Sequence, residues 1–225
     1  MLKDNIILMH LRLAKFMKFS ICNDNLDKLL FSEPKKIVIY GEAATGKTNI
    51  LLNTIKCSYT SLTQHETLFF ISTEGSSFVT RMYLLDIDSR NVFFSIAIDQ
   101  QHILSNVLEI VKNLDLLKPV CIIIDSINYH YRIESLTPIG IKLFTELLSL
   151  LDTFNENGVF IISSAQVRAS EDEVFPGYVY LHYWADIVIE LERISTSRRV
   201  LRIVKPKIDR LFQFDVVANG VKWLT

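Results

Sequence analysis

The chain has 225 residues, of which 49% are hydrophobic, and a mean hydropathy of +0.26. That is enough apolar material for a large core in one domain, and it excludes an intrinsically disordered protein. The 24 basic and 25 acidic side chains leave a net charge of −1, so the whole molecule carries no field that would attract nucleic acid. Any contact with DNA would need a local basic patch or an assembly.

The first 20 residues are apolar with scattered Lys, Arg and His, and no uninterrupted apolar run approaches the ~18 residues that a membrane span requires. They also lack the small-residue cleavage site of a signal peptide, so we expect no membrane partner and a cytoplasmic location. Residues 11–17 could form a short amphipathic helix, or Met17 could be the true start, leaving residues 1–16 as a loosely attached extension. No linker, internal repeat or low-complexity tract follows, which predicts an N-terminal extension over residues 1–19 and a single domain over residues 20–225.

The chain contains three cysteines, Cys22, Cys57 and Cys121. Their spacing is neither that of a metal site nor that of a C-x-x-C motif. Cys57 and Cys121 lie within apolar runs, which predicts core thiols in a protein from a reducing compartment.

Residues 41–48 read Gly-Glu-Ala-Ala-Thr-Gly-Lys-Thr, a complete G-x-x-x-x-G-K-[ST] phosphate-binding loop. The apolar, β-branched run 37–40 before it is typical of a buried strand, and residues 49–55 after it have helical spacing, so the motif stands in the context that it requires. Gly41 and Gly46 would let backbone N–H groups converge on one point at the N-terminus of the helix, where the helix dipole favours an anion. The alternative is an ordinary glycine-containing turn between a strand and a helix.

The loop predicts a binding site for a nucleoside triphosphate, with ATP and Mg²⁺ as the expected ligands. Lys47 would reach the β- and γ-phosphates, and the Thr48 hydroxyl would hold Mg²⁺. The loop residues expected to line the nucleotide are Gly41, Glu42, Ala43, Ala44, Thr45, Gly46, Lys47, Thr48 and Asn49.

Short apolar runs then alternate with helical patterns. Buried strands are predicted over residues 68–71, 92–96, 120–124 and 159–162. Apolar residues repeat at helical spacing between residues 103 and 114, and a longer helix is expected to begin at Thr137-Pro138 and end at residues 155–158. Strands that alternate with helices and are apolar on both faces predict a parallel sheet with right-handed crossovers.

The pattern changes after Trp184. Strands are predicted over residues 187–191, 200–204 and 211–216 without helices between them, with hairpin turns at residues 195–197 and at Gly220 before residues 221–223. The predicted fold class is therefore α/β, with a central, mostly parallel sheet flanked by helices and extended by antiparallel C-terminal strands.

Three polar residues follow predicted strands at what would be the ligand edge of the sheet. Asp125 would orient a Mg²⁺-bound water beside Thr48. Glu74 could align and deprotonate the water that attacks the γ-phosphate, and the Gln166 amide could bind the γ-phosphate and signal its presence to the following loop. The alternatives are a common strand-ending Asp, a capping or solvated carboxylate at Glu74, and an ordinary polar strand end at Gln166.

Four further segments, taken in order with the phosphate loop, resemble the RecA/RadA recombinase family, and most of all its short archaeal RadB-like RadA paralogues. Residues 25–30 are similar to the family's "LDxLL" lead into the loop, and residues 72–75 resemble its "DTEG" motif, with Arg81 where the family has Arg. Residues 124–134 are similar to the archaeal "VDSITxHYRxE" stretch, and residues 204–208 resemble the bacterial "VKNKI" segment. The likeness covers roughly residues 20–225.

This resemblance implies a RecA-type ATPase core that binds MgATP and hydrolyses it slowly, in a manner dependent on DNA or on assembly. It implies that Glu74 is the catalytic carboxylate, that Gln166 senses the γ-phosphate and that Arg81 contacts the nucleotide. Lys205 and Lys207 would reach the γ-phosphate of a neighbouring subunit in a homo-oligomer, as arginine fingers do. The alternative is two surface lysines on an edge strand that discourage aggregation.

The chain also departs from the family. We expect neither an N-terminal helix-hairpin-helix domain nor a Phe-x-x-Ala polymerisation peptide of the RadA kind, and the sequence contains only 7 glycines. Residues 31–35 replace the usual glycine run before the loop, and residues 171–173, Glu-Asp-Glu, would repel a DNA backbone. Arg132, Arg168 and Lys142 could form a modest basic patch or could be solvated surface.

We therefore expect an accessory protein that regulates homologous recombination and DNA repair and that acts on a RadA-type recombinase or single-stranded DNA, without strand exchange of its own. The alternatives are an ATP-gated binding scaffold without catalysis and a KaiC-like signalling ATPase. The "HYRxE"-like stretch argues against the second.

Overall fold

The computed structural model describes residues 19–87, 90–135, 137–167 and 176–224. The predicted helix over residues 11–17, Arg168 and the acidic residues 171–173 lie outside these ranges. No helix within the described ranges is long and apolar enough to cross a membrane.

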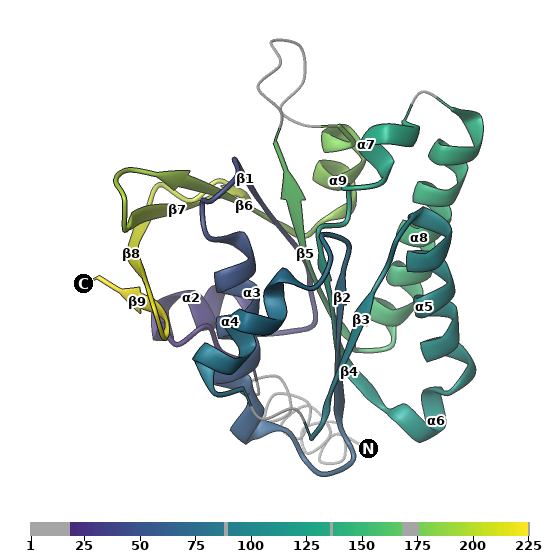
Figure 1. Cartoon of the computed structure of the whole chain (residues 1–225), viewed down its shortest axis with the longest axis horizontal. Coiled ribbons are helices and arrows are strands. Elements are labelled where there is room, and N and C mark those ends of the chain that lie inside the picture. Colours follow the sequence, from purple (N-terminus) through teal and green to yellow (C-terminus); the bar gives the residue numbers. More distant parts are fainter. Residues whose placement is uncertain (1–18, 88–89, 136, 168–175, 225) are drawn as a thin grey trace, which may run out of the picture.

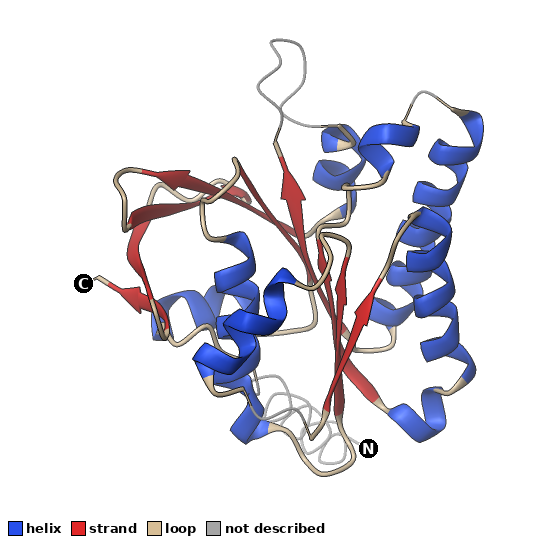
Figure 2. Cartoon of the chain, in the orientation of Figure 1, coloured by secondary structure: helices blue, strands red, loops and turns tan. Residues whose placement is uncertain are grey.

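The described residues form a nine-stranded sheet with helices on both faces (Figures 1 and 2). The strand order is β3-β2-β4-β5-β1-β6-β7-β8-β9, parallel as far as β6 and antiparallel from β7 to β9. The strands are β1 Lys36–Gly41, β2 Thr67–Ser72, β3 Val92–Ile96, β4 Pro119–Asp125, β5 Phe160–Gln166, β6 Ile187–Arg193, β7 Arg198–Lys205, β8 Leu211–Val217 and β9 Gly220–Trp223. The helices are α2 Asp24–Leu30, α3 Lys47–Ser58, η1 Tyr59–Ser61, α4 Ser77–Leu85, α5 Gln100–Lys112, α6 Leu114–Leu117, α7 Tyr131–Glu134, α8 Pro138–Glu156 and α9 Tyr178–Trp184.

The predicted fold class is confirmed at the level of this architecture: a mostly parallel sheet between helices, extended by antiparallel C-terminal strands. Each predicted strand is present, and α8 begins as expected, with the N-cap hydroxyl of Thr137 accepting a hydrogen bond from the Gly140 N–H at 3.0 Å. Sequence reasoning named no helix at α4 or α9, and both are present.

The sheet separates two apolar cores, because alternate residues of a strand point to opposite faces. In β1, Ile37 and Ile39 face the core covered by α2, α3 and α4, whereas Val38 and Tyr40 face the core covered by α5 and α8. The central strands are thus buried on both faces, which is why their sequences are continuous apolar runs.

The expectation of free core thiols is wrong for Cys57. In the structure Cys22 and Cys57 form a disulfide, and only Cys121 is a free, buried thiol. Cys57 lies near the C-terminal end of α3, where it is half-buried and within reach of the segment that enters the domain. The neighbouring Ile21 carbonyl accepts hydrogen bonds from Asn53 Nδ2 at 3.0 Å and Trp223 Nε1 at 2.8 Å, so the disulfide and this polar cluster attach the same segment to α3 and β9.

Candidate phosphate-binding site

The loop between β1 and α3 lies at the carboxyl edge of the parallel strands. Its first residue, Gly41, pairs with Gln166 on one side and with Leu191 on the other. A Cβ on Gly41 would lie 2.4 Å from the Leu191 carbonyl oxygen, so only glycine fits there. Ala44 and Gly46 have φ values of 62° and 98°, and this left-handed backbone turns the loop back on itself before α3 begins.

The Lys47 ammonium is hydrogen-bonded to the backbone at the start of the loop. Its Nζ donates to the carbonyl oxygens of Gly41 at 2.7 Å and Glu42 at 2.8 Å, and the residue is 7% exposed. An ammonium carries three donors, so one N–H and the positive charge remain for an anion in front of the loop. Burial lowers the pKa of Lys47, while the nearby carboxylates of Glu74 and Asp125 oppose this shift.

Asp125 lies behind the loop at the end of β4 and is 3% exposed. Its Oδ2 accepts a hydrogen bond from Thr48 Oγ1 at 2.7 Å, and its Oδ1 accepts one from Ser164 Oγ. Burial raises the pKa of this carboxyl, and the two hydrogen bonds act in the opposite direction. The structure therefore places the two predicted metal ligands in direct contact.

The donor set fits Mg²⁺, which prefers hard oxygen ligands and in nucleotide sites takes one or two from the protein and the rest from phosphates and water. No three His, Cys, Asp or Glu side chains of the described residues come together to hold a metal ion by themselves. A cation bound at Thr48 and Asp125 would thus depend on oxygens of a phosphate ligand.

Glu74 and Gln166 meet across the mouth of the site. Gln166 Nε2 donates to Glu74 Oε1 at 2.6 Å, and Gln166 Oε1 accepts from Arg132 Nη1. Glu74 follows β2 and Gln166 ends β5, two strands that stand on either side of β4. Sequence reasoning left Arg132 and Lys142 either in a modest basic patch or as solvated surface. In the structure Arg132 is bound to Gln166, while the exposed Lys142 lies 3.6 Å from Glu146.

These residues enclose a pocket of about 310 Å³. Its lining contains three cationic side chains, Lys47, Arg81 and Arg199, against one carboxylate, Glu74. Most of the residues predicted for nucleotide binding line it. The full lining is Ala43, Ala44, Gly46, Lys47, Thr48, Asn49, Glu74, Arg81, Gln166, Arg199 and Val216. Gly41, Glu42 and Thr45 support the loop without lining the pocket.

Of the residues that line the pocket, sequence reasoning missed Val216 and Arg199, and only Arg199 is charged. It is only 5% exposed, and its Nε donates to the Ala44 carbonyl at 3.2 Å. Its Nη1 donates to the carbonyl oxygens of Ser195 at 2.8 Å and Thr196 at 3.2 Å, so Arg199 ties the phosphate loop to the β6–β7 hairpin. The hydrogen bond from Arg199 Nε holds the carbonyl of Ala44, the one residue of the loop that adopts a positive φ without being glycine.

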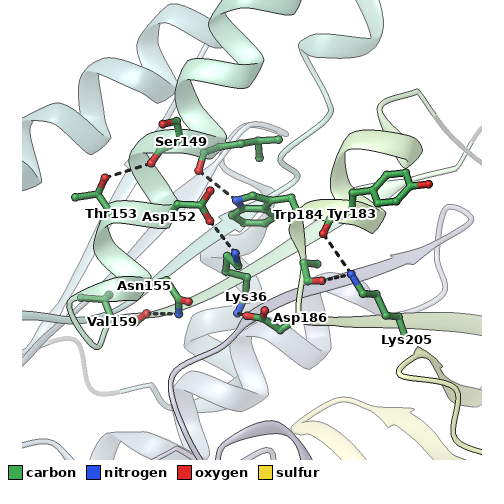
Figure 3. A network of polar contacts seen from close by, with 12 residues as sticks. Lys36, Ser149, Asp152, Thr153, Asn155, Val159, Tyr183, Trp184, Asp186 and Lys205 are labelled. Atoms are coloured by element: carbon green, nitrogen blue, oxygen red, sulfur yellow. Dashed lines mark hydrogen bonds and ion pairs between the residues drawn. The ribbon is translucent and has the colours of Figure 1, made fainter.

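Lys205 and Lys207 lie away from this pocket. Lys205 pairs with Val188 near the start of β6, at the amino-terminal ends of the parallel strands, whereas the loop lies at their carboxyl ends. Figure 3 shows its ammonium at the C-terminal end of α9, where it donates to the Tyr183 carbonyl oxygen at 3.3 Å. It also donates to the carbonyl oxygens of His182 and Ala185, both at 2.7 Å. β7 lies between β6 and β8, so Lys205 is not on an edge strand either. Lys207 is exposed in the turn that follows.

No protein-family model matches the chain, and no curated protein matches its sequence.

Proposed function

We propose that the chain binds a nucleoside triphosphate, ATP with Mg²⁺, in this pocket and hydrolyses it slowly. One observation carries the proposal: a loop with left-handed backbone at two residues and a buried lysine faces a pocket lined by three cations and one carboxylate, in a chain whose net charge is −1. Such an excess of positive charge favours a polyanion, and the strand–loop–helix geometry favours phosphate.

Each residue has a part in this reaction that follows from its position. The loop amides and the free N–H of Lys47 would bind the phosphate oxygens, and Thr48 with Asp125 would hold the cation. Glu74, exposed at the mouth, would accept a proton from the attacking water, and the Gln166 amide beside it would contact the γ-phosphate. When bound, Mg²⁺ neutralises negative charge that develops on the β- and γ-phosphate oxygens.

The likeness of residues 25–30, 72–75, 124–134 and 204–208 to the RecA/RadA family supports a RecA-type core. On that basis we propose an accessory role in homologous recombination and DNA repair, with a RadA-type recombinase or single-stranded DNA as partner. Neither Lys205 nor Lys207 lines the pocket of its own chain. Any contact of these lysines with a γ-phosphate would therefore be with the nucleotide of a neighbouring subunit.

Titration calorimetry tests nucleotide binding directly. Folded protein with Mg²⁺ should give a saturable heat with ATP, and Lys47→Ala should remove it while the thermal midpoint stays close to that of the wild type. A wild-type protein without measurable heat for either ATP or GTP would refute the proposal. The rate of ATP hydrolysis against protein concentration, with and without single-stranded DNA, then tests the dependence on assembly and on DNA.

A second candidate is an ATP-gated binding module in which turnover is incidental. The contact between Glu74 and Gln166 favours it, because a carboxylate that already accepts a 2.6 Å hydrogen bond is less available as a base. Partner capture discriminates the two functions. Equal capture of a recombinase in ATP and in a non-hydrolysable analogue, combined with no turnover, would support the module.

A further inference from the structure

The hydrogen bonds at the pocket mouth form a chain that extends beyond the pocket. Arg132 Nη1 donates to Gln166 Oε1, and Gln166 Nε2 donates to Glu74 Oε1 at 2.6 Å. The three side chains come from α7, the end of β5 and the turn after β2. Arg132 is not among the residues that line the pocket, so any effect on a bound ligand passes through Gln166.

The chemistry of Arg132 and Glu74, the two ends of this series of hydrogen bonds, determines which way the Gln166 amide between them points. A guanidinium can only donate hydrogen bonds, and an ionised carboxylate can only accept them. The Gln166 amide between them must therefore turn its carbonyl to Arg132 and its NH₂ to Glu74. Without Arg132 the carbonyl would lose its partner, and only the hydrogen bond from Nε2 to Glu74 would remain to hold the amide.

The turn that leads into α7 also fixes the Gln166 backbone. Asn128 Oδ1 accepts from the Gln166 N–H at 2.9 Å, and Asn128 Nδ2 donates to the Gln166 carbonyl at 3.1 Å. The Arg132 guanidinium lies 5.8 Å from the centre of the Tyr129 ring, within the range of a cation–π contact. Residues 128–132 thus hold both the backbone and the side chain of Gln166.

We propose that Arg132 is a positioning residue for ATP hydrolysis: by fixing the direction of the Gln166 amide, it orients the Glu74 carboxylate toward the attacking water. This inference rests on the function proposed above and adds the residue that sets the geometry of its base. Because Arg132 acts on orientation and not on phosphate binding, its loss slows turnover and leaves nucleotide affinity unchanged. A misplacement of about 1 Å in a catalytic group can cost roughly 100-fold, so the expected loss of kcat is about 10- to 100-fold.

A double-mutant cycle tests this. Arg132→Met should lower kcat with the ATP dissociation constant unchanged within about twofold, and Arg132→Lys, which keeps a donor, should recover part of the rate. In a Gln166→Ala background, Arg132→Met should cause no further loss, because the residue through which it acts is gone. The matched control is Arg210→Met: Arg210 also stacks on an aromatic ring, that of Phe212 at 4.9 Å, but lies outside the pocket, and its loss should leave kcat unchanged.

The outcomes separate the inference from the function on which it rests. A wild-type protein that binds no ATP refutes the proposed function. Suppose instead that the wild type binds and hydrolyses ATP. If Arg132→Met then slows turnover by the same factor in both backgrounds, or weakens ATP binding, only the role of Arg132 is overturned. The thermal midpoint of each variant is measured alongside, and should Arg132→Met fail to fold, Arg132→Gln in the same two backgrounds supplies the comparison.

Discussion

Removal of the disulfide between Cys22 and Cys57 should lower the free energy of unfolding by about 3.8 kcal/mol. The two cysteines are 35 residues apart in the sequence. In the chain-entropy treatment, a closed loop of that length removes about 12.7 cal/mol/K from the unfolded chain, which is about 3.8 kcal/mol at 25 °C. At roughly 2–4 °C per kcal/mol for a domain of this size, the thermal midpoint should fall by about 8–15 °C.

The assay compares thermal unfolding of wild type and Cys22→Ser, each with and without dithiothreitol. Reductant should lower the midpoint of the wild type to that of Cys22→Ser and leave the variant unchanged, because its remaining cysteines form no disulfide within the chain. Denatured, unreduced wild type should titrate as one thiol, that of Cys121, and as three after reduction. Three thiols before reduction, or a midpoint that ignores reductant, would refute the reasoning.

Three further predictions concern the site and the lysines far from it. Glu74→Gln should keep ATP binding and reduce turnover by about 10²–10⁴-fold, the usual contribution of a general base, and unchanged single-turnover kinetics would remove Glu74 from the mechanism. Arg199→Met should weaken ATP binding by roughly 10-fold in calorimetry, because the loop loses the hydrogen bond that holds its positive-φ residue, and an unchanged dissociation constant would count against that role. Lys205→Met should cost about 1–3 kcal/mol in denaturant unfolding because the last carbonyls of α9 lose their donor, whereas Lys207→Met should cost nothing measurable, and equal effects would contradict the contacts of Lys205.

The strands of the sheet could be predicted from the sequence because the signal for each strand lies within its own residues. Strands β2 and β4 contain continuous apolar runs and β5 begins with one, and such sequences are typical of strands buried on both faces. The start of α8 could also be predicted from the sequence, since Thr137 followed by Pro138 combines an N-cap side chain with a residue that suits the first turn.

Two of the helices that sequence reasoning did not name, α4 and α9, lacked a local signal. In α9, of sequence Tyr-Val-Tyr-Leu-His-Tyr-Trp, only Leu181 is buried, and its aromatic and β-branched residues are typical of strands. Its helical form depends on contacts from afar, including the Lys205 ammonium at its C-terminal end. In α4 only Phe78 and Leu85 are buried, which is too few to reveal a helical period.

Arg199 and the disulfide were missed for a related reason. Arg198 and Arg199 are adjacent in β7, so they point to opposite faces, and the sequence does not say which face meets the loop. In the structure Arg198 pairs with Asp215 at 3.4 Å on the exposed face, while Arg199 is buried against Ala44. Cys22 and Cys57 likewise come together only because the entering segment packs on α3.

The order of the strands explains why residues that follow different strands could be expected to lie together. Neighbours β2, β4, β5 and β1 run parallel, so Glu74, Asp125, Gln166 and Gly41 all lie at one edge, although each follows a different strand. The contacts that join them span 77 residues from Thr48 to Asp125 and 92 from Glu74 to Gln166. The phosphate loop is one short local segment, whereas the carboxylate and amide at its mouth depend on the whole sheet. Substitutions in the loop should therefore affect ligand binding first, and substitutions at the distant strand ends should affect turnover first, so the two properties can be separated by mutation within this single domain.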